Sequence, residues 1–215
     1  QPFVIYVSMK GENVNNPQWN NGLPFTVSMA DTNIIKQAIE TTKKMYSMFD
    51  NVVVTTDVSV WQSAGVDRRV KIIVGNSSAL GPYLGYAWVN CYLWQDDTPA
   101  FVLVNNCNQT QLLADIGYGI THEAGHMFGL EHQYASGGSG FKSWATLMGN
   151  WASKNFITWS NNDIIALRAI FGSTDDYVNS VSQWINNPSN VGKPFSGFIT
   201  FDDPADVCRM KGSVT

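Results

Sequence analysis

The stretch HEAGHMFGLEH, residues 122–132, constrains the fold more than any other part of the chain. His122 and His126 are four residues apart, so on a helix their imidazoles lie on one face, about one turn apart. Glu123 is rotated by about 100° from His122, which places its carboxylate beside the two rings. The sequence therefore predicts a helix, over residues 109–129, that presents two metal-binding side chains and one carboxylate together.

A third ligand follows where this helix must end. His132 lies six residues after His126, which is too far to stay on the same helical face. Gly129 stands where the chain has to turn, and glycine readily adopts the positive φ that ends many helices. Three histidines can hold one tetrahedral Zn²⁺ and leave a fourth position open, as in catalytic zinc sites.

The histidine count supports a functional interpretation of the stretch. The chain contains three histidines, and all three lie within residues 122–132. Histidines that merely satisfy hydrogen bonds in a core or on a surface would not cluster in this way. We therefore expect Zn²⁺ as the cofactor, held by His122, His126 and His132. Glu123 is expected to act as the general base on water.

Composition indicates a globular protein that does not bind nucleic acid. At 215 residues the chain can form one domain with a sizeable core, or a domain with an appendage. It is 44% hydrophobic and only 14% charged, which argues against disorder. The net charge of −4 provides no basic face for phosphate backbones. No apolar run approaches the roughly 20 residues that span a bilayer.

The start of the chain and its cysteines bear on its compartment. The first residues resemble a strand, not a signal peptide, while Asn, Ser, Thr, Gly and Trp are abundant. Either the protein is cytosolic, or this is the mature or trimmed form of a secreted protein, and the composition favours the second interpretation. We also expect a monomer. Cys91 and Cys107 flank a segment that could double back and bring them together in a disulfide, leaving Cys208 unpaired. Three buried free thiols are the alternative.

Hydrophobic periodicity predicts alternating strands and helices. The expected strands cover residues 3–9, 51–56, 70–74, 85–89 and 100–104, with a polar loop over residues 11–22. The expected helices cover residues 31–49 with Asp31 as N-cap, residues 109–129 with Asn108 or Thr110 as cap, and residues 161–171 between Ser160 and Gly172. This order predicts an α/β (α+β) fold in which helices pack on a twisted sheet.

The character of the chain changes after Gly172. Residues 173–194 are polar and resemble a linker, whereas residues 195–201 again resemble a strand. We therefore expect one domain over residues 1–172. Residues 173–215 are expected to form a linker and a C-terminal extension, either packed on the domain or the beginning of a second β module.

The zinc motif and the sequence around it resemble the metzincin clan of zinc endopeptidases. In that clan the elongated motif is followed by a methionine turn, which residues 145–149 (ATLMG) fit with Met148. Residues 49–57, 99–106 and 144–159 resemble secreted bacterial reprolysin-like (adamalysin-like) members, within a resemblance that spans residues 2–172. It implies a zincin fold: a twisted mixed sheet with an active-site helix, a backing helix and a C-terminal helix. It also implies that Met148 forms an apolar floor under the three imidazoles.

Two positions depart from the better-known families of the clan. Gln133 follows the third histidine, where those families carry Asp, Glu, Ser or Pro. Asn150 stands two residues after Met148, where astacin-like and serralysin-like members carry a tyrosine that reaches the metal. No tyrosine ligand is therefore expected, and the subfamily stays open.

The resemblance implies a secreted zinc-dependent endopeptidase that acts on extended polypeptides. Such a substrate would add as a strand to an exposed sheet edge, which the resemblance places at Gly85, Tyr86 and Ala87. Trp151 and Phe156 would line an apolar pocket beyond the scissile bond, although either could belong to the core.

Other functions remain open at this point. A non-catalytic binding or adhesion module could keep zinc for structure, although structural sites normally use four protein ligands. A zinc hydrolase could instead act on a glycan or an amide. Ca²⁺ could bind near Asp96 and Asp97 or near Asp202 and Asp203, although acidic pairs more often belong to solvated loops.

Overall fold

The computed structural model describes residues 1–132, 144–149, 156–159, 161–172, 194–200 and 207–213. The chain divides into two compact units, Gln1–Glu131 and His132–Thr215. The predicted boundary after Gly172 stays a prediction.

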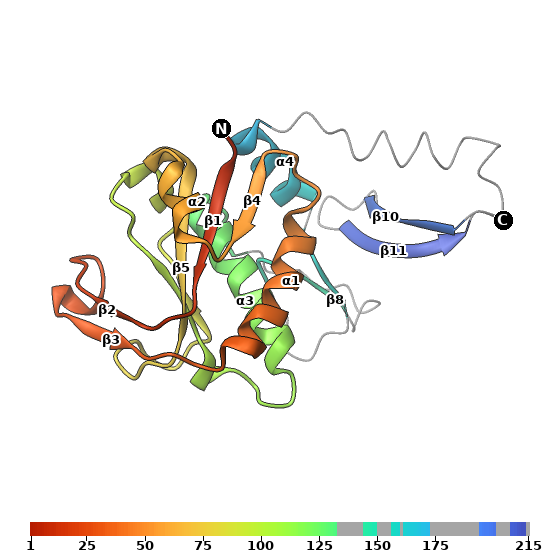
Figure 1. Cartoon of the computed structure of the whole chain (residues 1–215). Helices are drawn as coiled ribbons and strands as arrows, with labels where there is room; N and C mark the ends of the chain where they lie inside the picture. The colour runs from red at the N-terminus through yellow and green to blue at the C-terminus, as the bar shows by residue number, and fades with distance from the viewer. Residues whose placement is uncertain (133–143, 150–155, 160, 173–193, 201–206, 214–215) are drawn as a thin grey trace. The chain divides into compact units, whose positions relative to one another are not determined.

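A five-stranded sheet in the order β4-β1-β5-β7-β6 forms the centre of the first unit (Figure 1). Four strands run parallel to one another: β1 (Phe3–Ser8), β4 (Val52–Thr55), β5 (Arg69–Gly75) and β7 (Ala100–Leu103). The short edge strand β6 (Gly85–Tyr86) is antiparallel to β7. All six residues of β1 are buried, as expected for a strand covered on both faces of a parallel sheet.

Two helices cover one face of this sheet. α1 (Thr32–Tyr46) and α3 (Leu112–Met127) pack against each other, α1 against β4 and α3 against β5, β6 and β7 (Figure 1). The short helix α2 (Val58–Ser63) packs beside β1 and β4. α3 therefore lies close to the edge of the sheet that β6 forms.

A hairpin covers the other face. β2 (Glu12–Val14) pairs with β3 (Phe25–Val27), and the 3-10 turn η1 (Asn20–Gly22) lies between them. Neighbouring residues of a strand point to opposite faces, so Phe101 and Leu103 face the hairpin while Val102 faces α3. The apolar cluster on the hairpin side comprises Val14, Trp19, Val27, Ile73, Leu80, Phe101 and Leu103.

Three further 3-10 turns lie between elements of the first unit: η2 (Val66–Arg68) between α2 and β5, η3 (Cys91–Trp94) between β6 and β7, and η4 (Val104–Asn106) between β7 and α3. In the second unit, β8 (Trp144–Thr146) pairs in parallel with β9 (Phe156–Thr158), and α4 (Asn161–Phe171) follows. β10 (Pro194–Thr200) and β11 (Val207–Ser213) form an antiparallel pair. The strand expected at residues 195–201 is thus present, whereas β11 was not predicted.

The α/β class expected from the sequence is confirmed. The N-cap at Asp31 is also confirmed, because its Oδ1 accepts the N–H groups of Asn33 at 2.8 Å and Ile34 at 3.4 Å. The helix ends at Tyr46 and not at residue 49. Within the predicted polar loop at residues 11–22, β2 was missed because its pattern carries one apolar residue in three.

The predicted start of the histidine-bearing helix is wrong. α3 begins at Leu112, and its N-cap residue Gln111 makes no side-chain cap. Asn108 does not cap it, because its Oδ1 accepts the N–H and the hydroxyl of Thr110 at 3.0 and 2.9 Å in a turn that precedes the helix. The expected strand at residues 85–89 is likewise shorter, since only Gly85 and Tyr86 pair with β7.

Among the described helices, none combines the length and apolar character needed to cross a membrane.

Candidate metal centre

The last two turns of α3 carry His122 and His126. Both side chains are buried, and their ring centroids lie 4.5 Å apart with the ring planes at 87°. The spacing of four residues thus brings the two imidazoles together, as the sequence predicted.

A Schellman turn ends the helix at Gly129. The residue has φ +98°, and its N–H donates to the carbonyl of His126 at 2.8 Å. The N–H of Leu130 donates to the carbonyl of Gly125 at 3.0 Å, which completes the pair of hydrogen bonds that defines this cap. The predicted turn at Gly129 is therefore confirmed.

The same turn fixes the orientation of one imidazole. The carbonyl oxygen of Leu130 lies 2.7 Å from Nδ1 of His126. A carbonyl only accepts hydrogen bonds, so Nδ1 must carry the proton, which leaves Nε2 of His126 with a lone pair. A backbone carbonyl that holds the second ring nitrogen in this way is the usual support of a metal-binding histidine.

His122, His126 and His132 form a group that could hold a metal ion. One ligand atom from each residue lies within 4.8 Å of the others, with the first two residues buried and His132 exposed. Three imidazole donors suit Zn²⁺ but also other divalent transition metals. The residues present therefore fit the expected metal without selecting zinc alone.

Glu123 lies against the edge strand of the sheet. Its side chain is buried, and the loss of solvation raises the pKa of its carboxyl group to about 8. A Cβ atom added at Gly85 of β6 would lie 2.6 Å from Cδ and 2.8 Å from Cγ of Glu123. Only glycine leaves room at this point, so the carboxylate and the backbone of β6 come into direct contact.

Polar groups on α1 hold α3 in place just before the histidines. The hydroxyl of Tyr46 donates to the carbonyl of Thr121 at 3.3 Å, and the hydroxyl of Thr42 donates to the carbonyl of Gly117 at 3.1 Å. All of these groups are buried, where hydrogen bonds that are lost leave costly unpaired atoms.

The segment after β6 is hydrogen-bonded to the last turn of α3, which carries His126. The N–H of Asn90 donates to the carbonyl of His126 at 2.8 Å, and Asn90 itself adopts a left-handed conformation with φ 64°. Sequence reasoning missed Asn90, Tyr46 and Leu130. The positive φ tolerated by asparagine is a weak signal for Asn90, while a carbonyl such as that of Leu130 has no signature in the sequence.

The remaining predicted site residues fall in different surroundings. Gly85 and Tyr86 form β6, and Ala87 follows directly. The ring of Tyr86 packs against the hairpin-side cluster and its hydroxyl donates to the carbonyl of Leu80 at 3.3 Å, so its side chain has a structural role. Met148 is buried in a turn after β8.

The structure does not test the predicted roles of several other residues. Phe156 begins β9. The remaining positions lie outside the described residues: Gln133, Asn150 and Trp151.

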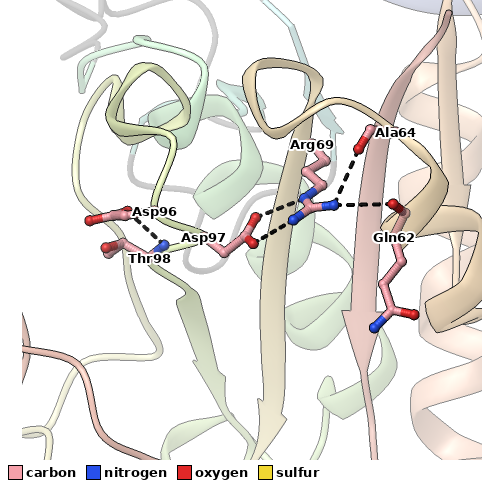
Figure 2. A network of polar contacts seen from close by, with 6 residues as sticks. All are labelled: Gln62, Ala64, Arg69, Asp96, Asp97 and Thr98. Carbon is pink, nitrogen blue, oxygen red and sulfur yellow. Dashed lines mark hydrogen bonds and ion pairs between the residues drawn. The ribbon is translucent and has the colours of Figure 1, made fainter.

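The acidic pair considered for Ca²⁺ is engaged otherwise. Both carboxylate oxygens of Asp97 bind the guanidinium of Arg69, at 2.9 Å from Nε and 2.6 Å from Nη2, as Figure 2 shows. Oδ1 of Asp96 accepts the N–H of Thr98 at 3.0 Å. A bidentate ion pair occupies the oxygens that a cation would need. Asp202 and Asp203 lie outside the described residues.

Cys91 and Cys107 are free and buried. The disulfide that was considered between them is therefore not formed. Burial raises the pKa of each thiol to about 12, which keeps both protonated and unreactive. Cys208 lies in β11.

No protein-family model matches the chain, and a search of curated proteins found no match either.

Proposed function

We propose that the protein is a secreted, zinc-dependent endopeptidase. The observation that carries the proposal is the position of Glu123. A buried carboxylate follows the first of three grouped histidines directly in the chain and touches the edge strand of a sheet. The resemblance of residues 2–172 to metzincins supports the same function.

The chemistry follows from the residue types. His122, His126 and His132 would hold Zn²⁺, which when bound would lower the pKa of a coordinated water toward about 7 and polarise a carbonyl. The positive charge of the bound ion would favour the ionised form of Glu123, against the effect of burial. Glu123 takes the proton as the water oxygen bonds to the carbonyl carbon, and delivers it to the nitrogen as the C–N bond breaks. No further histidine exists to share these transfers.

The edge strand β6 provides a place for the peptide. Among the described residues, β6 pairs with β7 alone. An extended peptide can therefore add along its other side by main-chain hydrogen bonds. Gly85 would allow the peptide backbone to approach the carboxylate of Glu123 without a side chain between them.

Replacement of Glu123 by Gln tests the proposal. We expect the purified chain to cleave an unstructured protein such as casein, and a chelator to stop cleavage reversibly. Glu123→Gln should bind zinc with parent stoichiometry and lower kcat/KM by at least about 100-fold, because a general base contributes 10²–10⁴-fold. Cleavage would be followed by mass spectrometry and zinc content by atomic absorption.

Glu40→Gln is the matched control, since Glu40 is exposed on α1 and forms an ion pair with Lys43. It should cleave like the parent. A parent chain that binds zinc but cleaves no peptide would contradict the proposal and favour a binding module. Full activity in Glu123→Gln would remove Glu123 from the mechanism.

A further inference from the structure

Exposed tryptophans follow β6 along the chain. Trp88 is 42% exposed and Trp94 is 41% exposed, and Val89 and Leu93 between them are exposed as well. Large apolar side chains gathered on one surface mark binding sites more often than chance exposure. We call Trp19, Trp88 and Trp94 the tryptophan platform.

The platform is rigid because its base is buried. The ring centroid of Trp88 lies 5.6 Å from that of Trp19 and 6.0 Å from that of Trp94. Trp19 donates its Nε1–H to the carbonyl of Pro99 at 2.9 Å and packs edge-on against Phe101, 5.1 Å away. Side chains that are already held in place lose little entropy when a ligand binds.

The platform lies close to the candidate metal centre. The segment of residues 85–90 is held at both ends by α3, through Gly85 against Glu123 and through Asn90 on the carbonyl of His126. Trp88 is three residues from the first contact and two from the second. Its Cα therefore lies within about 11 Å of Gly85 and about 7 Å of Asn90, the maximum reach of an extended chain.

The two faces of β6 have different neighbours. Gly85 pairs with Val102, which faces α3, whereas Tyr86 pairs with Phe101, which faces Trp19. A peptide added to this edge would also alternate its side chains between the two faces. Those on the α3 side would adjoin Glu123, and those on the other side would meet the platform.

We propose that the tryptophan platform is a subsite for an aromatic or large apolar side chain of the polypeptide substrate, about three residues from the scissile bond. The inference rests on the proposed endopeptidase function. The rings of Trp88 and Trp94 are inclined at 45° to each other, so a further aromatic ring can stack on one of them or pack edge-on against it.

A peptide series tests the subsite with the zinc-loaded full chain. The peptides share one sequence and carry Trp or Ala at each position within four residues of the cleaved bond. At one position we expect kcat/KM to be about tenfold higher for Trp than for Ala. Trp88→Ala should reduce that ratio to near one, while Trp88→Phe keeps most of it. Val58→Ala, which removes an exposed apolar side chain from α2, should leave the ratio unchanged.

Binding of the same labelled peptides to the Glu123→Gln chain, measured by fluorescence anisotropy, separates this inference from the proposed function. If the parent cleaves nothing but Trp88 still confers about tenfold tighter binding of the Trp peptide, the endopeptidase proposal fails and the subsite stands. Equal rates and equal affinities for Trp and Ala at every position would overturn the subsite. So would binding of cellohexaose or chitohexaose through Trp88 without discrimination among peptides, which would identify a glycan surface.

Discussion

The turn at Gly129 determines both where α3 ends and how His126 is oriented. The positive φ of Gly129 lets Leu130 fold back over the last helical turn. The carbonyl of Leu130 thereby reaches Nδ1 of His126 and leaves Nε2 as the nitrogen that could bind a metal. Backbone conformation at one glycine thus controls the orientation of a candidate metal ligand three residues away.

Gly129→Ala should weaken metal binding. A side chain at φ +98° costs about 1–2 kcal/mol, and any relief of that strain displaces the carbonyl of Leu130 from His126. Loss of a supporting hydrogen bond to a metal ligand typically costs 10–100-fold in affinity, so we expect zinc affinity to fall by at least about tenfold. Competition with a chromophoric chelator measures this change.

Gly172→Ala is the matched control for this substitution. Gly172 also has a positive φ, +61°, and a Cβ added there meets no atom of the described residues within 4 Å. It should show a similar loss of stability with unchanged zinc affinity. Equal loss of affinity in both variants would mean that Gly129 acts only through general destabilisation.

The three histidines and Glu123 could be predicted from sequence because helical spacing alone brings His122, Glu123 and His126 together. The backbone groups that support the histidines could not be predicted from sequence. The carbonyl of Leu130 and the N–H of Asn90 are backbone atoms, and their positions depend on how the chain folds around α3. The contact between Glu123 and Gly85 joins segments 38 positions apart, which no local pattern encodes.

At the scale of elements, predictions succeeded where local chemistry decides the outcome. Asp31 begins α1 because its own carboxylate caps the first free N–H groups. The start of α3 was predicted too early because the side chain of Asn108 accepts the N–H of Thr110 in a turn and does not cap the helix. Sequence does not resolve the choice between these two local hydrogen-bond patterns. β6 is short because the chain leaves the sheet after Tyr86 to reach His126 through Asn90.

Arg69 connects three elements of the first unit. Besides its two bonds to Asp97, its Nη1 donates to the carbonyls of Gln62 at 3.3 Å and Ala64 at 3.2 Å, at the end of α2 (Figure 2). Its guanidinium also lies 4.5 Å from the ring centroid of Trp61. The planar group thus joins β5, α2 and the loop that precedes β7.

Arg69→Lys should lower the free energy of unfolding by about 1–2 kcal/mol, because an ammonium cannot make these bonds in several directions at once. Urea denaturation measures the difference. Lys43→Ala removes an ion pair whose side chains are 47% and 58% exposed and should change stability by less than about 0.5 kcal/mol. An equal change in the free energy of unfolding for the two substitutions would show that the hydrogen-bond geometry around Arg69 adds nothing to stability.

At the scale of the whole molecule, the alternation of apolar segments was enough to predict an α/β fold. It did not predict the order of the strands, because order depends on which crossovers bury the most surface. β1 lies between β4 and β5 although it comes first in the sequence, and β6 lies at the edge although it precedes β7. Because β6 lies outside β7, the histidine-bearing helix α3 has an antiparallel edge strand as its neighbour.

Zinc should stabilise the folded chain as a whole, since His122, His126 and His132 come together only when it is folded. A ligand at 100 times its Kd adds about 2.7 kcal/mol, which corresponds to a rise in Tm of about 5–10 °C for a chain of this size. We therefore expect zinc to raise Tm by this amount and EDTA to reverse the rise, as measured by differential scanning calorimetry. His126→Ala should abolish the shift, whereas Glu123→Gln should keep it because Glu123 is not a ligand. A parent chain whose Tm does not respond to zinc, or a His126→Ala chain that responds like the parent, would show that the three histidines do not form the metal site.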